Sequence, residues 1–261
     1  MKNKKSEAFF CCVLFCIIIT VAILHSKTNY NNNYYKNRCF YMVSLAKTRA
    51  TNSIDKLKSM VSSVNGAGFV YEKNNYYYVL LACYNQKKQA ETKVKEMASK
   101  FNSCEIIKIA CDNLSNKMIS ILEKENQINM AFIKMVEVTD LSFKFVSKQS
   151  SASYVYNCLN KNKLELKKVA GNLGKNTRYD NVCKVLHKAI DDYITLIDSI
   201  STEIYQGKSL VKSLNKLSVE CGFLEQMLRK ELNTLWFLCG KKLNCFCKFI
   251  WLVDIWNMVL S

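Results

Sequence analysis

The sequence predicts an α+β protein: a ferredoxin-like βαββαβ domain, an all-α helical hairpin or bundle after it, and an N-terminal transmembrane helix. Three observations lead to this fold class. Two strand–helix–strand patterns follow one another in residues 38–112, helical and heptad spacing continues over 113–236, and residues 8–24 form an uncharged, mainly apolar run. We expect five segments: a cytoplasmic stub and anchor (1–25), a tether (26–37), the sheet domain (38–112), the helical region (113–236) and an apolar tail (237–261).

The apolar run at 8–24 is close to the shortest length that spans a bilayer. Lys2, Lys4 and Lys5 precede it, which favours a cytoplasmic N-terminus with the bulk of the chain outside the membrane. A cleaved signal peptide is the alternative, but the run is long for one and lacks a small-x-small cleavage site. The Asn- and Tyr-rich stretch 26–37 has no period and is typical of a tether.

The strand predictions rest on alternation, because successive side chains of a strand point to opposite faces. One face is expected to carry Tyr41, Val43, Leu45, Tyr77, Val79 and Leu81, and the other Met42, Ser44, Ala46, Tyr78, Leu80 and Ala82. Apolar residues spaced by three and four, such as Ile54, Leu57 and Val61, predict a helix after each strand. The helices would cover the first face, joined to the next strand by the turn at residues 65–68, and leave the second face open for binding.

Residues 38–112 contain the segments YMVSLA at 41–46, GAGFVY at 66–71, and YYV at 77–79 leading through Tyr84 to QAE at 89–91. In these segments the chain resembles a SPOR (sporulation-related repeat) domain of the clostridial type. The resemblance covers about 75 of the 261 residues. The resemblance implies a non-catalytic protein that binds peptidoglycan glycan strands stripped of stem peptides, on the open sheet face, at division or sporulation septa.

The expected glycan-binding residues are those of the open face and its edge strand: Met42, Ser44, Tyr71, Tyr78 and Leu80. The family often has Gln where this chain has Ser44 and Gly where it has Ala46, so an amide that would bind a sugar is missing. Outward tyrosines are also common on strands for structural reasons alone. An envelope adaptor that binds another protein, with glycan binding lost, is therefore the main alternative.

The helical region is expected to hold four helices: 114–146, 154–173, a third that ends at Gly207, and a fourth after it. Heptad positions predict that the last two form an antiparallel hairpin, with a dimer interface as the alternative use of the same apolar seam. The third helix carries Tyr179, Cys183, Leu186, Ile190, Tyr193, Ile197, Ile200 and Ile204, and the fourth Leu210, Leu214, Leu217, Cys221, Leu224, Leu228 and Leu235. The tail would pack on this bundle or lie at the membrane interface.

No catalytic or cofactor motif is present in the sequence, so we expect no enzyme, no cofactor and no metal. His25 and His187 are isolated, and Cys245-Phe246-Cys247 lacks the paired spacing of a zinc site. Cys83, Cys104, Cys183 and Cys221 occupy apolar-periodic positions and are expected to be small buried side chains.

The formal net charge of +17 favours anionic partners such as lipid head groups and wall polymers. The expected partners are glycan strands, the membrane, division or sporulation proteins, and a second copy through the helical region. An RNA-binding domain shares the βαββαβ order, but its aromatic motif belongs on the third strand and here falls on the second. Export by the anchor also removes the domain from RNA, so no nucleic-acid partner is expected.

Overall fold

The computed structural model describes residues 34–174 and 178–259, with side chains as far as Leu235. The chain divides into two compact units, Met1–Lys36 and Asn37–Ser261, and all elements below belong to the second. The predicted anchor at 8–24 lies outside the described residues. None of the helices in the described part of the chain combines the length and apolar character that a membrane span requires.

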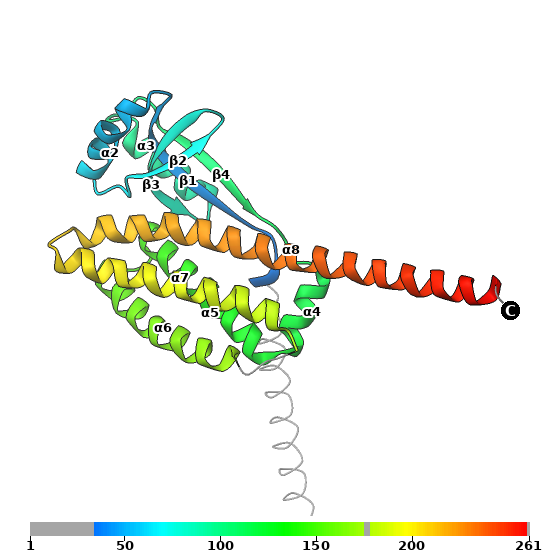
Figure 1. Cartoon of the computed structure of the whole chain (residues 1–261). Coiled ribbons are helices and arrows are strands. Elements are labelled where there is room, and N and C mark those ends of the chain that lie inside the picture. Colours follow the sequence, from blue (N-terminus) through cyan, green and yellow to red (C-terminus); the bar gives the residue numbers. More distant parts are fainter. Residues whose placement is uncertain (1–33, 175–177, 260–261) are drawn as a thin grey trace, which may run out of the picture. The chain divides into compact units, whose positions relative to one another are not determined.

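A four-stranded antiparallel sheet opens the second unit and confirms the α+β class (Figure 1). Its strands are β1 (Arg38–Thr48), β2 (Phe69–Lys73), β3 (Tyr76–Tyr84) and β4 (Glu105–Cys111), in the order β2-β3-β1-β4 across the sheet. A short 3-10 turn, η1 (Thr51–Ser53), and α2 (Ile54–Ser63) connect β1 to β2, and α3 (Lys87–Met97) connects β3 to β4. The predicted succession of two strand–helix–strand units is thus present.

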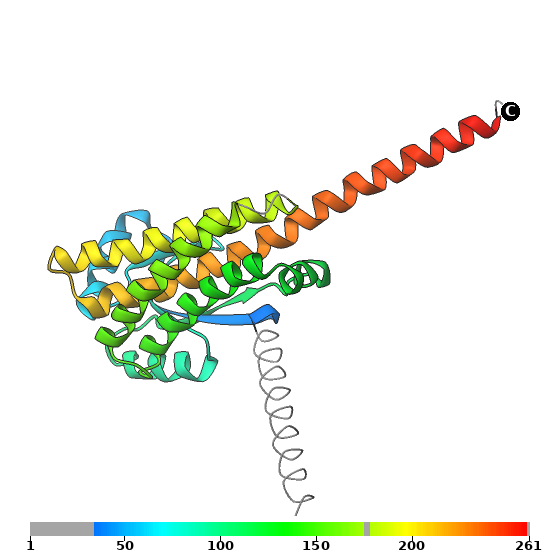
Figure 2. The same cartoon turned by 90° about the horizontal axis from the view of Figure 1, so that it is seen from below.

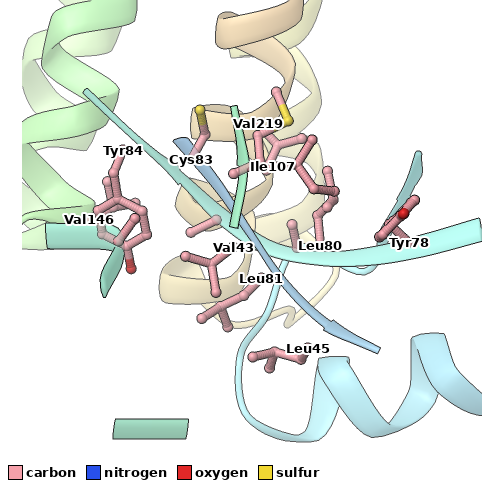
Figure 3. Packing of buried hydrophobic residues seen from close by; sticks show 14 of the residues in the cluster. Val43, Leu45, Tyr78, Leu80, Leu81, Cys83, Tyr84, Ile107, Val146 and Val219 are labelled. Carbon is pink, nitrogen blue, oxygen red and sulfur yellow. The ribbon is translucent and has the colours of Figure 1, made fainter. Parts of the chain in front are cut away.

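Helices α2 and α3 lie on one face of the sheet, as predicted (Figure 1). Val61 of α2 and Ala90 and Met97 of α3 are buried in the same apolar cluster as the strand residues. Figure 3 shows Val43, Leu45 and Leu81 on this side of the sheet, with Cys83, Ile107 and Val219 on the opposite side. Both faces of the sheet therefore contribute to one core.

The predicted alternation fails at the centre of the sheet, where the pairing of β1 with β3 is irregular on both sides of Ser44. Ala82 pairs with Val43, and Ala46 pairs with Val79. Directly opposite residues of paired strands share a face. Ala46 and Ala82 therefore lie on the face of Val43 and Val79, and their assignment to the face of Met42 was wrong. A local register shift moves side chains to the other face without changing the apolar pattern that predicted the strands.

The helical region contains α4 (Asn116–Lys124), α5 (Asn126–Val146), α6 (Ala152–Leu173), α7 (Asp180–Tyr205) and α8 (Leu210–Val259). The single helix expected over 114–146 is wrong, because Glu125 is extended (φ −110°, ψ 91°) and separates α4 from α5. Ser115 and Ser151 cap α4 and α6, each accepting a backbone N–H three residues on. The polar break predicted at 147–153 is present, but it covers only 147–151 because α6 begins at Ala152.

The hairpin of α7 and α8 is confirmed, and Figure 2 shows it from a second side. Gly207 ends α7 in the left-handed region (φ 77°), where glycine is favoured. Glu203 of α7 accepts hydrogen bonds from Ser213 (2.7 Å) and Lys216 (3.0 Å) of α8. Most predicted heptad positions of both helices are buried, including Ile190, Ile197, Leu214 and Leu228. Helix α8 continues to Val259, and the side chains of the predicted tail lie outside those described.

Candidate functional site

The sheet face expected to be open is covered by the chain's own helices, so that expectation was wrong. Met42, Ser44 and Leu80 are 0% exposed and Tyr78 is 7% exposed. Tyr71, on the edge strand, is half-buried. The structure therefore brings the five predicted residues onto one face but leaves only Tyr71 with substantial access to solvent.

Helix α8 covers this face through small residues that allow a close approach. A Cβ added to Gly222 would lie 3.2 Å from Cys83 Sγ and 3.6 Å from Met42 Cε. Ser218 Oγ accepts the backbone N–H of Cys83 at 3.0 Å, a donor in the irregular part of the sheet. The predicted sugar-binding hydroxyl of Ser44 is turned inward, donating to the carbonyl oxygens of Ala46 (2.8 Å) and Val79 (3.3 Å).

Aromatic and amide side chains of α8 extend the contact to the edges of the sheet. The Phe223 ring lies 5.4 Å from that of Phe69 and 5.3 Å from that of Tyr71, both on β2. At the other edge, Gln226 Nε2 donates to the carbonyl oxygen of Ala110 on β4 at 3.2 Å. Helix α5 adds Phe143, whose ring lies 5.1 Å from that of Phe40. The face is thus covered from β2 to β4.

We expect Gly222→Leu to destabilise the protein by about 1–3 kcal/mol, because a side chain there must push α8 away from the sheet. The matched change Gly171→Leu on α6 has nothing within 4 Å of its Cβ and should gain up to about 1 kcal/mol from helix propensity. Urea unfolding of the full chain in detergent would compare the two. Shifts of the same sign and size would contradict close packing at Gly222.

A buried charge network (Arg38, Asp140, Glu225, Arg229) ties β1, α5 and α8 together under this face. Glu225 and Arg229 are both 0% exposed. Glu225 Oε1 lies 2.8 Å from Arg229 Nη2 and 3.3 Å from Arg38 Nε, and Arg38 also pairs with Asp140. Burial raises the pKa of Glu225, while the nearby guanidinium groups of Arg38 and Arg229 oppose that rise.

The open end of the sheet carries what we call the tyrosine patch (Lys47, Arg49, Tyr71, Tyr76, Tyr78). Lys47 Nζ lies 4.4 Å from the Tyr76 ring centre and 5.0 Å from that of Tyr78, and the Arg49 guanidinium lies 4.3 Å from that of Tyr76. A hydrogen bond to Tyr78, followed by the interaction with Glu105, raises the pKa of Lys47. The sequence analysis did not identify Lys47, Arg49 and Tyr76 as site residues, although all three lie at or next to the ends of β1 and β3.

Cysteine and histidine side chains form no metal-binding group among the described residues. The seven described cysteines have free thiols. Cys83, Cys183 and Cys221 are buried as predicted, whereas Cys104 is half-buried. Burial raises the pKa of the Cys111 thiol to about 12, which keeps it protonated and unreactive. His187 is exposed beside Asp191, and His25 lies outside the described residues.

A groove runs along α7 and α8, and we call it the α7–α8 groove. One part has a volume of about 520 Å³ and is lined by Phe69, Leu196, Phe223, Leu224 and Met227, with Asp192 and Glu220 among its polar residues. A second part of about 460 Å³ is lined by Val185, Leu235 and Glu231, and Met227 belongs to both. Met227 is 50% exposed, so the groove presents apolar surface to solvent.

Comparison with known proteins adds no relative to this description. The chain matches no protein-family model, and no curated protein and no solved structure shows a significant match to it.

Proposed function

We propose that the chain is a non-catalytic adaptor of the cell envelope, attached to the membrane by its N-terminal segment, whose SPOR-like ferredoxin-type sheet binds its own helical region instead of glycan. The burial of Met42, Ser44 and Leu80 beneath α8 carries this proposal. A side chain with no accessible surface has no atom to offer to a sugar. The same cover would keep RNA bases from the strand aromatics.

Opening the face would require α8 to leave the sheet, which is energetically costly. The apolar contacts of Val219, Gly222 and Phe223 would be lost, and the pair of Glu225 with Arg38 would be broken. Re-exposing a fully buried apolar side chain costs about 1.5–3 kcal/mol, so losing several such contacts would use a large part of the ~5–15 kcal/mol by which typical proteins are stable. The covered state is thus the working state of the proposed adaptor.

A second candidate function, glycan binding at the tyrosine patch, has its own supporting observation. The patch keeps Tyr71 and Tyr78 of the predicted site and adds the cations Lys47 and Arg49 beside Tyr76. A glycan strand whose stem peptides have been removed by an amidase carries free carboxylates, which these cations would attract. Against it, Lys47 already pairs with Glu105 at 3.3 Å, and the cations occupy ring faces on which a sugar would stack.

Co-pelleting of the full chain with sacculi distinguishes the two functions. Intact sacculi and sacculi stripped of stem peptides are compared at low and at high salt. For the adaptor we expect equal pelleting with both at low salt, caused by the +17 charge, and loss of pelleting at high salt. Salt-resistant preference for stripped sacculi would overturn the proposal.

A pair of variants then assigns any such preference to the tyrosine patch. Arg49→Ala with Tyr76→Ala should abolish it if the patch binds glycan. The control Lys88→Ala with Tyr205→Ala removes one exposed cation and one exposed tyrosine outside the patch, and should leave it unchanged.

A further inference from the structure

Among the exposed large apolar residues, two lie on α6 within a basic stripe. Tyr154 and Leu164 are each 58% exposed, and Lys161 and Lys168 are exposed on the same face. Their spacing of seven, three and four residues places them in one line along the helix. We call these four residues the α6 outer stripe. From Tyr154 to Lys168, 14 residues further along the helix, it extends about 21 Å.

Contacts on the opposite side of α6 fix the direction in which the stripe points. Tyr156 Oη donates to Ser201 Oγ at 3.2 Å, and Lys163 pairs with Asp198, both on α7. In Figure 1, α7 lies between α6 and α8. Glu165, the acidic residue of α6, forms an ion pair with Lys134 of α5 at 2.7 Å, so its charge is neutralised within the bundle. The α6 outer stripe is therefore basic, apolar and turned away from the bundle.

The α7–α8 groove has the complementary character. Its lining residues on α8 recur at three- and four-residue intervals from Lys216 to Leu235, a length of about 28 Å, which exceeds that of the stripe. Helix α7 carries five carboxylates against two lysines, in a chain whose net charge is +17. A groove between two antiparallel helices is a common seat for a third, amphipathic helix.

The charges at the groove also favour a basic occupant. No ion pair involves Asp192 among the described residues, and Glu220 is partly buried at the groove wall. Lys216 lies 3.0 Å from Glu203 but 3.9 Å from Glu220, so it is engaged mainly with Glu203. Lys216 and Lys230 are the opposing charges in the lining, and Glu231 already lies 3.6 Å from Lys188 of α7. A lysine brought from outside would therefore gain from Asp192 and Glu220.

We propose that this chain binds a second copy of itself, with the α6 outer stripe of one copy seated in the α7–α8 groove of the other. Tyr154 and Leu164 would cover the apolar floor around Leu224 and Met227, and Lys161 and Lys168 would face Asp192, Glu220 and Glu231. Because stripe and groove are different surfaces, the contact is heterologous, and it forms chains or rings unless two such contacts close a dimer. The proposal does not depend on the adaptor function.

Charge reversal tests this contact with the full chain in density-matched detergent, using sedimentation velocity over a range of protein concentrations. Wild-type protein should self-associate, more weakly at high salt. The stripe variant (Lys161→Glu, Lys168→Glu) and the groove variant (Asp192→Lys, Glu231→Lys) should each associate at least tenfold more weakly. An equal mixture of the two should recover association, because the unchanged stripe of the groove variant meets the unchanged groove of the stripe variant, and the acidic stripe meets the basic groove.

With a control variant and the mixture, each result either supports or overturns the proposed self-association. The control Lys56→Glu with Lys88→Glu makes the same change in charge as the stripe variant, at exposed positions of α2 and α3. It should associate like wild type. Recovery in the mixture would show that both variants are folded. A wild-type chain that stays monomeric at tens of micromolar, a stripe variant that associates like wild type, or a mixture that fails to recover would each overturn the proposal. The sacculus experiment is unaffected by these results.

Discussion

Glu225→Leu is expected to destabilise the protein by about 3–5 kcal/mol, because it leaves the guanidinium of Arg229 buried without the carboxylate that it contacts. Arg38 loses the same partner but keeps Asp140. The desolvation cost of the buried cation remains, while the attraction of the carboxylate 2.8 Å away is lost. Urea unfolding of the full chain in detergent, followed by circular dichroism, would measure the loss.

Two further variants separate the charge from the packing. Glu91→Leu removes the carboxylate of an exposed i,i+4 pair with Lys87 and should change stability by no more than about 0.5 kcal/mol. The double variant Glu225→Leu/Arg229→Met removes both charges and should regain part of the stability, because replacing a buried pair by apolar groups is often tolerated. If Glu225→Leu costs no more than Glu91→Leu, the network does not hold α8 to the sheet.

The sequence alone was sufficient to predict the strands and helices whose apolar residues are spaced so that they mark one buried face. The two strand–helix–strand patterns predicted the four strands, and the heptads of Ile190, Ile197, Leu214 and Leu228 predicted the α7–α8 hairpin with its turn at Gly207. The division between α4 and α5 at Glu125 was not predictable, since neither glycine nor proline marks it.

The cover over the second sheet face was missed, although the strands contained a signal for it. Strands buried on both faces have near-continuous apolar runs, and YYYVLLACY in β3 is such a run. Phe40 and Met42 are likewise apolar on the face that was expected to be open. The covering surface of α8 gives a weaker signal, because Ser218 and Gly222 contact the sheet by being small.

Glu225 and Arg229 show why the buried charges were not recognised. Their spacing of four residues is typical of an exposed helical pair, and the exposed Lys87 and Glu91 have the same spacing. Only the tertiary position of Arg38, 187 residues before Glu225 in the chain, shows that the pair faces a core. Pairwise spacing within a helix carries no information about what covers that helix.

Phe40→Ala is the second substitution with a large expected effect, about 3–5 kcal/mol of destabilisation. The Phe40 side chain is 0% exposed, stands 5.1 Å from the ring of Phe143 on α5, and lies beneath Gly222 of α8. Its removal leaves a cavity where β1, α5 and α8 meet. The control Tyr205→Ala, at a position 93% exposed, should stay within about 0.5 kcal/mol of wild type.

The form of the unfolding curve is as informative as its midpoint. Since sheet and helices share the core around Phe40, the Asn37–Ser261 unit should unfold in one transition, with circular dichroism and tyrosine fluorescence coinciding. Phe40→Ala should move both signals together to lower urea. Two separate transitions, of which the variant shifts only one, would mean that residues 38–112 and 113–236 fold independently. The face of the sheet would then be accessible without unfolding the helices, and glycan binding there would again become the stronger hypothesis.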